Sequence, residues 1–166
     1  MDTSIVLEAR SQILIVDDSL DDLSLLRKIL RDKGYGVHST PQAERALQFL
    51  ESHTPDLILT DLHMAGMDGY ELCEILAANV NTRDIPVIVV SGADQVVDKM
   101  KAFSKGVADY ILKPYVPVEV LARIRTHLSL RNLQKDLEVR VKERTRDLTK
   151  AIASLQEEVD TLRKKN

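Results

Sequence analysis

Short runs of apolar, often β-branched residues alternate with amphipathic stretches along most of this chain. A continuous apolar run of four or five residues is typical of a strand that is covered on both faces of a sheet. The second run is weaker than the others, so we expect it at a sheet edge. The predicted strands are residues 13–16, 35–39, 57–59, 87–90 and 108–112.

Each predicted strand is followed by apolar residues at helical spacing. In the first helix, the stripe ends before Gly34, which can form a C-terminal cap. Thr40 is the expected N-cap of the second helix, with Pro41 in its first turn. Residues 62–69 contain two glycines and are predicted to be a loop. The four stripes are Leu23, Leu26 and Leu30; Ala43, Ala46, Leu47 and Leu50; Leu72, Ile75 and Leu76; and Val96, Val97 and Met100.

Five strand–helix units with short connections predict an α/β fold. Parallel crossovers are right-handed and place helices over the sheet. The sequence therefore predicts a doubly wound, five-stranded parallel sheet with helices on both faces.

A fifth helix is expected to begin near Val116 and to continue to the end of the chain, because no Gly or Pro follows Pro117. Its apolar residues recur every three or four positions, as in a coiled coil with charged flanks. The alternative, a single solvated helix, would leave this stripe in water. Two steps of four around Val141 would locally unwind the supercoil. The stripe is Leu130, Leu133, Leu137, Val141, Leu148, Ile152, Leu155, Val159 and Leu162.

Composition narrows the classes of partner. The 166 residues are 44% apolar and 30% charged, which suits one globular domain with an appendage. The net charge of −3 and the lack of a basic run with aromatics argue against nucleic-acid binding. Neither a signal peptide nor an 18-residue apolar stretch is apparent, so we expect a cytoplasmic protein without membrane contact. The single Cys73 is expected to be a packed thiol.

Five polar residues follow four of the strands: Asp17 and Asp18, Asp61, Ser91 and Lys113. The carboxyl ends of parallel strands share one edge, so these side chains should converge. Three clustered carboxylates repel one another unless a cation lies among them, and ligands that are all oxygens suit Mg²⁺. A Lys and a hydroxyl could bind phosphoryl oxygens, while one carboxylate acts as the nucleophile.

Over about residues 12–128, the chain resembles the receiver domain of two-component response regulators. The stretch DLILTDLHMAGMDGYEL carries much of this likeness. The resemblance implies a flavodoxin-like strand order of 2-1-3-4-5, with Asp61 as the phospho-acceptor. It also implies that Mg²⁺ is held by Asp18 and Asp61 directly, by Asp17 through a water, and by the backbone carbonyl of His63.

The resemblance assigns further roles at the same edge. Lys113 would contact the phosphoryl group, and the bond to Pro114 would be cis. Ser91 and Tyr110 would form the switch that responds to phosphorylation. Residues 64–67 lack the proline that similar receivers commonly have after the methionine, which should slightly loosen the loop.

The predicted organisation is an N-terminal extension (1–11), a receiver domain (12–128) and a coiled-coil signalling helix (129–166). The stretch VKERTRDL resembles helices that join receivers to outputs such as nucleotide cyclases, diguanylate cyclases or histidine kinases. We expect a non-enzymatic switch that takes phosphate from a sensor histidine kinase or histidine phosphotransfer protein and forms a parallel homodimer.

Two other functions fit parts of the pattern. An aspartyl-nucleophile phosphatase also uses Asp, Ser, Lys and Mg²⁺, but such enzymes have a general-acid Asp at the position of His63. A coiled-coil adaptor with an inactive receiver is the second alternative, and the complete set of site residues argues against it.

Overall fold

The computed structural model describes residues 10–92, 104 and 106–165. Its single described sheet has five parallel strands in the order β2-β1-β3-β4-β5, which confirms the predicted order. The second strand lies at an edge, as expected from its weak apolar pattern. The strands are β1 (Gln12–Val16), β2 (Gly36–Thr40), β3 (Leu57–Thr60), β4 (Val87–Gly92) and β5 (Asp109–Lys113).

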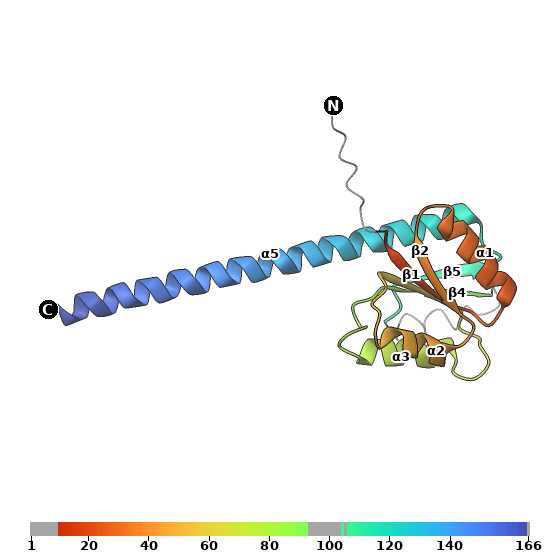
Figure 1. The fold of residues 1–166 in the computed structure, drawn as a ribbon, viewed down its shortest axis with the longest axis horizontal. Helices are drawn as coiled ribbons and strands as arrows, with labels where there is room; N and C mark the ends of the chain where they lie inside the picture. The colour runs from red at the N-terminus through yellow and green to blue at the C-terminus, as the bar shows by residue number, and fades with distance from the viewer. Residues whose placement is uncertain (1–9, 93–103, 105, 166) are drawn as a thin grey trace, which may run out of the picture. The chain divides into compact units, whose positions relative to one another are not determined.

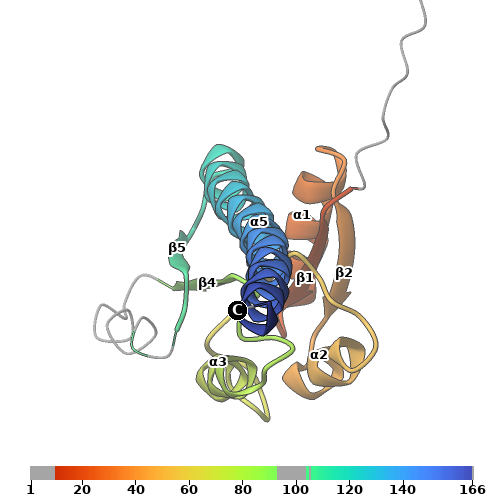
Figure 2. The ribbon, with the colours of Figure 1, turned by 90° about the vertical axis from the view of Figure 1, so that its left-hand side faces the viewer.

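Helices cover both faces of the sheet (Figures 1 and 2). One face packs against α2 and α3, and the other packs against α1 and the first turns of α5. The predicted helix with Val96, Val97 and Met100 lies outside the described residues. The described helices are α1 (Leu20–Arg31), α2 (Ala43–Leu50), α3 (Gly69–Ala78) and α5 (Pro117–Lys164).

The apolar strands are buried because each contributes to two core layers. In β1, Leu14 and Val16 face α2 and α3, whereas Ile13 and Ile15 face α1 and α5. Successive side chains of a strand point to opposite faces. A strand with helices on both sides therefore needs an unbroken apolar run.

Capping residues define where the helices begin. Ser19 caps α1, and its hydroxyl accepts a hydrogen bond from the Asp22 amide over 3.3 Å. The prediction that Thr40 caps α2 was wrong, because the N-cap is Gln42. Thr40 instead is the last residue of β2, paired with Val16. The Thr40 hydroxyl accepts a hydrogen bond from the Gln42 amide over 3.3 Å, so it closes the turn that precedes α2 and does not cap the first turn of the helix.

The fifth helix begins at Pro117 and extends to Lys164, in agreement with the unbroken helical sequence. The chain divides between Ser129 and Leu130 into two compact units. In the second unit, the apolar stripe is exposed. Within the described part of the chain, no helix combines the length and apolar character needed to cross a membrane.

Candidate functional site

Three carboxylates meet at the carboxyl edge of the sheet. Val16 of β1 pairs with Thr60 of β3, so the residues that follow, Asp17 and Asp61, leave the sheet side by side. The Asp61 amide donates to the carbonyl of Val16 over 2.9 Å. One carboxylate oxygen from each of Asp17, Asp18 and Asp61 lies within 4.8 Å of the other two. The structure thus brings the predicted acidic residues together.

Lys113, at the end of β5, reaches into this cluster. Its Nζ donates to Oδ2 of Asp17 at 2.9 Å and to Oδ2 of Asp61 at 3.0 Å. It also donates to Oδ2 of Asp22 at 2.8 Å. Sequence analysis did not single out Asp22, which lies in the first turn of α1. An acidic residue there is common for its favourable interaction with the helix dipole, so the sequence carries no distinguishing signal.

The electrostatics of the cluster follow from its burial. The side chain of Asp17 is only 2% exposed. Burial raises the pKa of Asp17 above its ordinary value, although the hydrogen bond from Lys113 acts in the opposite direction. Burial by itself lowers the pKa of Lys113, but its hydrogen bonds to Asp22, Asp17 and Asp61 outweigh burial and raise that pKa. Lys113 is therefore firmly cationic and offsets part of the negative charge.

The donor set fits a hard divalent cation. Carboxylate oxygens are the ligands that Mg²⁺ prefers, and the described residues of the cluster contribute no Cys or His side chain as an alternative ligand. Asp18 and Asp61 also accept hydrogen bonds from backbone amides. Oδ2 of Asp18 accepts from the Ala65 amide at 3.1 Å, and Oδ1 of Asp61 accepts from the His63 amide at 3.1 Å. Such contacts orient carboxylates for a metal.

The loop after Asp61 is anchored at several points. Oε1 of Glu44 in α2 accepts a hydrogen bond from the Met67 amide over 3.2 Å. The Gly69 amide donates to the carbonyl of Leu62 at 2.9 Å. A side chain on Gly69 would collide with the backbone of Asp61 and Leu62, so the loop can close here only around a glycine. The backbone of Asp61 is therefore packed directly against the first residue of α3.

Ser91 and Tyr110 lie on β4 and β5, the two strands on the Lys113 side of the sheet. Ser91 is buried near the end of β4, where its neighbour Gly92 pairs with Lys113. Tyr110 of β5 is 6% exposed and belongs to the core layer against α2 and α3. The Lys113–Pro114 bond is cis, as the resemblance implied. The switch role of Ser91 and Tyr110 stays a prediction.

Residues 13–125 match the family model of the response regulator receiver domain. The chain belongs to this family of two-component signalling domains, whose general function is to be phosphorylated by a kinase. The family is a signalling family rather than a typical enzyme family.

Individual relatives agree with the family assignment. The chain is 35% identical over 130 residues to the heme response regulator HssR of Staphylococcus aureus strain JH9. That alignment covers 78% of this chain and 57% of HssR, so the chain spans little more than half the length of this relative.

Solved structures show the same fold. A putative response regulator from Chloroflexus aurantiacus matches with a TM-score of 0.70 and 31% identity, over 72% of this chain and 98% of the other. The receiver domain of a signal transduction histidine kinase from Syntrophus aciditrophicus matches with a TM-score of 0.68 and 34% identity, over 72% and 90%.

Proposed function

We propose that this receiver accepts a phosphoryl group on Asp61 from a sensor histidine kinase or a histidine phosphotransfer protein, in a Mg²⁺-dependent reaction. The observation that carries the proposal is the contact of Lys113 Nζ with both Asp61 and Asp17, beside the three-carboxylate cluster. In the proposed reaction, Asp61 would be the nucleophile, Lys113 the fixed cation, and the carboxylate cluster the metal site.

In the proposed reaction, a carboxylate oxygen of Asp61 attacks phosphorus. The bond from phosphorus to the donor imidazole nitrogen breaks as the new acyl-phosphate bond forms. Lys113 binds a phosphoryl oxygen with a charge-assisted hydrogen bond. Asp18 and Asp61, with the carbonyl of His63 and with Asp17 through a water, would hold Mg²⁺, whose charge would offset that of the phosphoryl oxygens.

Signal output is proposed to pass through β5 and α5. The Asp109 carboxylate accepts Arg123 Nη1 at 2.7 Å and contacts His127 Nε2 at 3.0 Å, which ties the strand carrying Tyr110 to α5. A response of Ser91 and Tyr110 to phosphorylation would thus alter the helix. The receiver (12–128) would act through a signalling helix (129–166) that dimerises in parallel and meets an output domain or partner.

The chemistry is tested by phosphorylation with a small phosphodonor in the presence of Mg²⁺. We expect one acid-labile, hydroxylamine-sensitive phosphate per chain in the wild type and none in Asp61→Asn. Asp32→Asn, at the exposed C-cap of α1, is the matched control and should label fully. Asp18→Ala should raise the Mg²⁺ concentration that labelling requires.

The same labelling separates the alternative functions. A switch keeps a stoichiometric phosphate, an aspartyl phosphatase turns over repeatedly, and an adaptor with an inactive receiver does neither. Phosphate retained on Asp61→Asn would contradict the assignment of the acceptor.

A further inference from the structure

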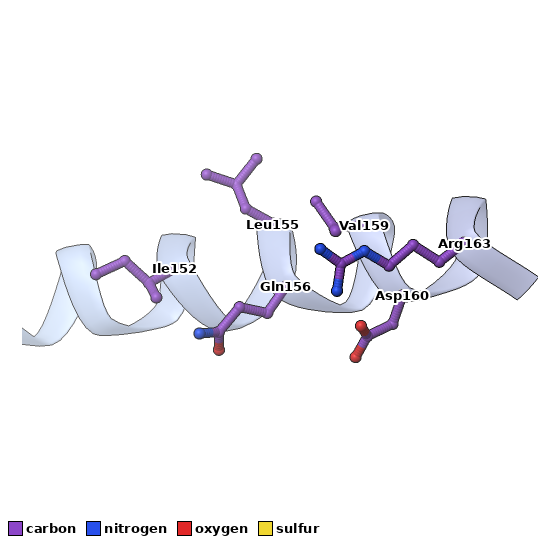
Figure 3. A pocket seen from close by; sticks show the side chains of 6 residues that line it. All are labelled: Ile152, Leu155, Gln156, Val159, Asp160 and Arg163. Carbon is purple, nitrogen blue, oxygen red and sulfur yellow. The ribbon is translucent and has the colours of Figure 1, made fainter.

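The helical tail carries a hollow of about 450 Å³ on the surface of α5 (Figure 3). Ile152, Leu155, Gln156 and Val159 line it, and Asp160 and Arg163 extend the lining toward the C-terminus. The three apolar side chains are 46–61% exposed. A helix that exposes such a stripe in water is stabilised when another surface covers the stripe.

The residues around the hollow occupy defined positions of a heptad repeat. The stripe from Leu148 to Leu162 steps by four, three, four and three, so Ile152 and Val159 occupy a positions and Leu155 a d position. Gln156 is then an e position. In a parallel coiled coil, residues a, d, e and the next a surround the d side chain of the facing helix. The hollow thus has the lining of a hole for a d-position leucine.

We propose that a second copy of this chain occupies the hollow, parallel and in register, with its Leu155 inserted between Ile152 and Val159. This inference deepens the proposed function by identifying the dimer surface and what fixes its orientation. A second copy suits the site because an in-register partner presents its own Leu155 opposite the hollow. It also presents an identical hollow to the first copy, so both apolar stripes are covered at once.

Charges beside the stripe specify the orientation. Glu158 is a g position and Arg163 is the e position five residues later. Parallel, in-register helices place a g residue next to the e residue five positions on in the partner, so Glu158 meets Arg163 of the second copy twice per dimer. Antiparallel helices instead pair g with g and e with e, which separates these charges. The pair therefore favours the parallel dimer.

The same two residues do not face each other within one helix, because helical neighbours are three or four residues apart. On its own helix, Arg163 has Asp160 three positions before it, and both side chains line the hollow. A charge exchange between positions 158 and 163 therefore tests contact between chains.

The first experiment measures the dimer dissociation constant of the full chain by sedimentation equilibrium. Glu158→Lys and Arg163→Glu should each raise the constant about tenfold, because each variant places like charges together at two symmetric sites. The double variant should recover to near the wild-type value. Glu157→Lys makes the same charge change at an outward f position and should have little effect. Monomeric wild type, or a double variant weaker than both single variants, would overturn the proposal.

The second experiment tests register. Leu155→Cys should form an intermolecular disulfide readily, whereas Glu157→Cys, on the outer face, should not. The native Cys73 does not interfere, because it is buried and burial raises the pKa of its thiol to about 12. Equal cross-linking at both positions would contradict the assigned register.

Phosphorylation of Asp61 is measured on the same samples. Normal labelling of a monomeric chain would refute the dimer surface and leave the receiver function standing. A dimer with this charge pattern that takes no phosphate would refute the receiver function alone.

Discussion

The backbone amide of Ala65 donates a hydrogen bond to Oδ2 of Asp18 over 3.1 Å. The bond joins the turn after β1 to the loop after β3, and it orients the Asp18 carboxylate. A proline at position 65 has no N–H and could not form it. This chain thus fixes a proposed metal ligand through a backbone group that the Met-Pro form of the loop would lack.

We therefore predict that Ala65→Pro weakens Mg²⁺ binding about tenfold, since removal of an outer contact to a metal ligand commonly costs 10- to 100-fold in affinity. Ala65→Ser retains the amide and is the matched control. Calorimetric titration with Mg²⁺ gives the affinities. Unchanged or tighter binding by the proline variant would mean that the amide does not help Asp18 to bind metal.

Lys113 should contribute most to stability when Mg²⁺ is absent. Lys113→Ala leaves the buried carboxylate of Asp17 without its cationic partner. The expected loss in chelator is about 2 kcal/mol of unfolding free energy. Added Mg²⁺ should stabilise this variant more than the wild type, because the metal replaces the missing charge.

Urea unfolding with chelator and with Mg²⁺ measures the effect of Lys113→Ala. Lys150→Ala, on the exposed tail, should change little in either medium. A loss of the same size in both media would show that Mg²⁺ does not compensate for the lysine.

The turn at Gly69 should tolerate no side chain. Gly69→Ala forces a methyl group against the backbone of Asp61 and Leu62, and overpacking of this kind typically costs 1–3 kcal/mol. Both thermal stability and the rate of Asp61 phosphorylation should fall. Gly92→Ala, where the described surroundings leave open space, is the control. Full phosphorylation with unchanged stability would show that the loop can shift freely.

Asp109 should stabilise the fold in a pH-dependent way. Burial acts to raise the pKa of Asp109, but hydrogen bonds from His127, the Tyr110 amide and Arg123 lower it below the ordinary value of 3.8. A carboxyl with a lowered folded-state pKa stabilises the protein fully above 3.8, and this contribution is lost as the pH falls through the lowered value.

Asp109→Asn should therefore cost about 1 kcal/mol at neutral pH, a modest figure because Arg123 is partly exposed and screened. The deficit should shrink in acid, as denaturant unfolding at several pH values would reveal. A double-mutant cycle with Arg123→Gln isolates the ion pair. A deficit that does not vary with pH would indicate lost packing rather than lost charge.

The sheet and the meeting of Asp17, Asp61 and Lys113 could be predicted from sequence, because they follow from local patterns. Apolar runs define the strands, and the carboxyl ends of parallel strands share one edge. The long fifth helix was predictable for a similar reason, since no Gly or Pro follows Pro117.

Contacts that depend on loop conformation could not be predicted from the sequence. Glu44 and Asp22 read as ordinary acidic residues in the first turns of helices, and only the folded chain brings them to Met67 and Lys113. The Ala65 contact uses the backbone, so its side chain gives no sign of it. The start of α2 was misplaced because a threonine hydroxyl can also close a turn outside a helix. Oγ1 of Thr40 accepts the Gln42 amide, and α2 begins only at Ala43.

The pairing of Val16 with Thr60 limits where the domain can accept insertions and deletions. A residue inserted or deleted within β1 would move Asp17 by about 3.3 Å along the sheet and turn the side chains beyond it to the opposite face. Both core layers and the acidic cluster would then be lost together. Length variation among descendants of this gene should therefore be confined to the amino-edge loops, such as residues 51–56, where it leaves the strand alignment intact.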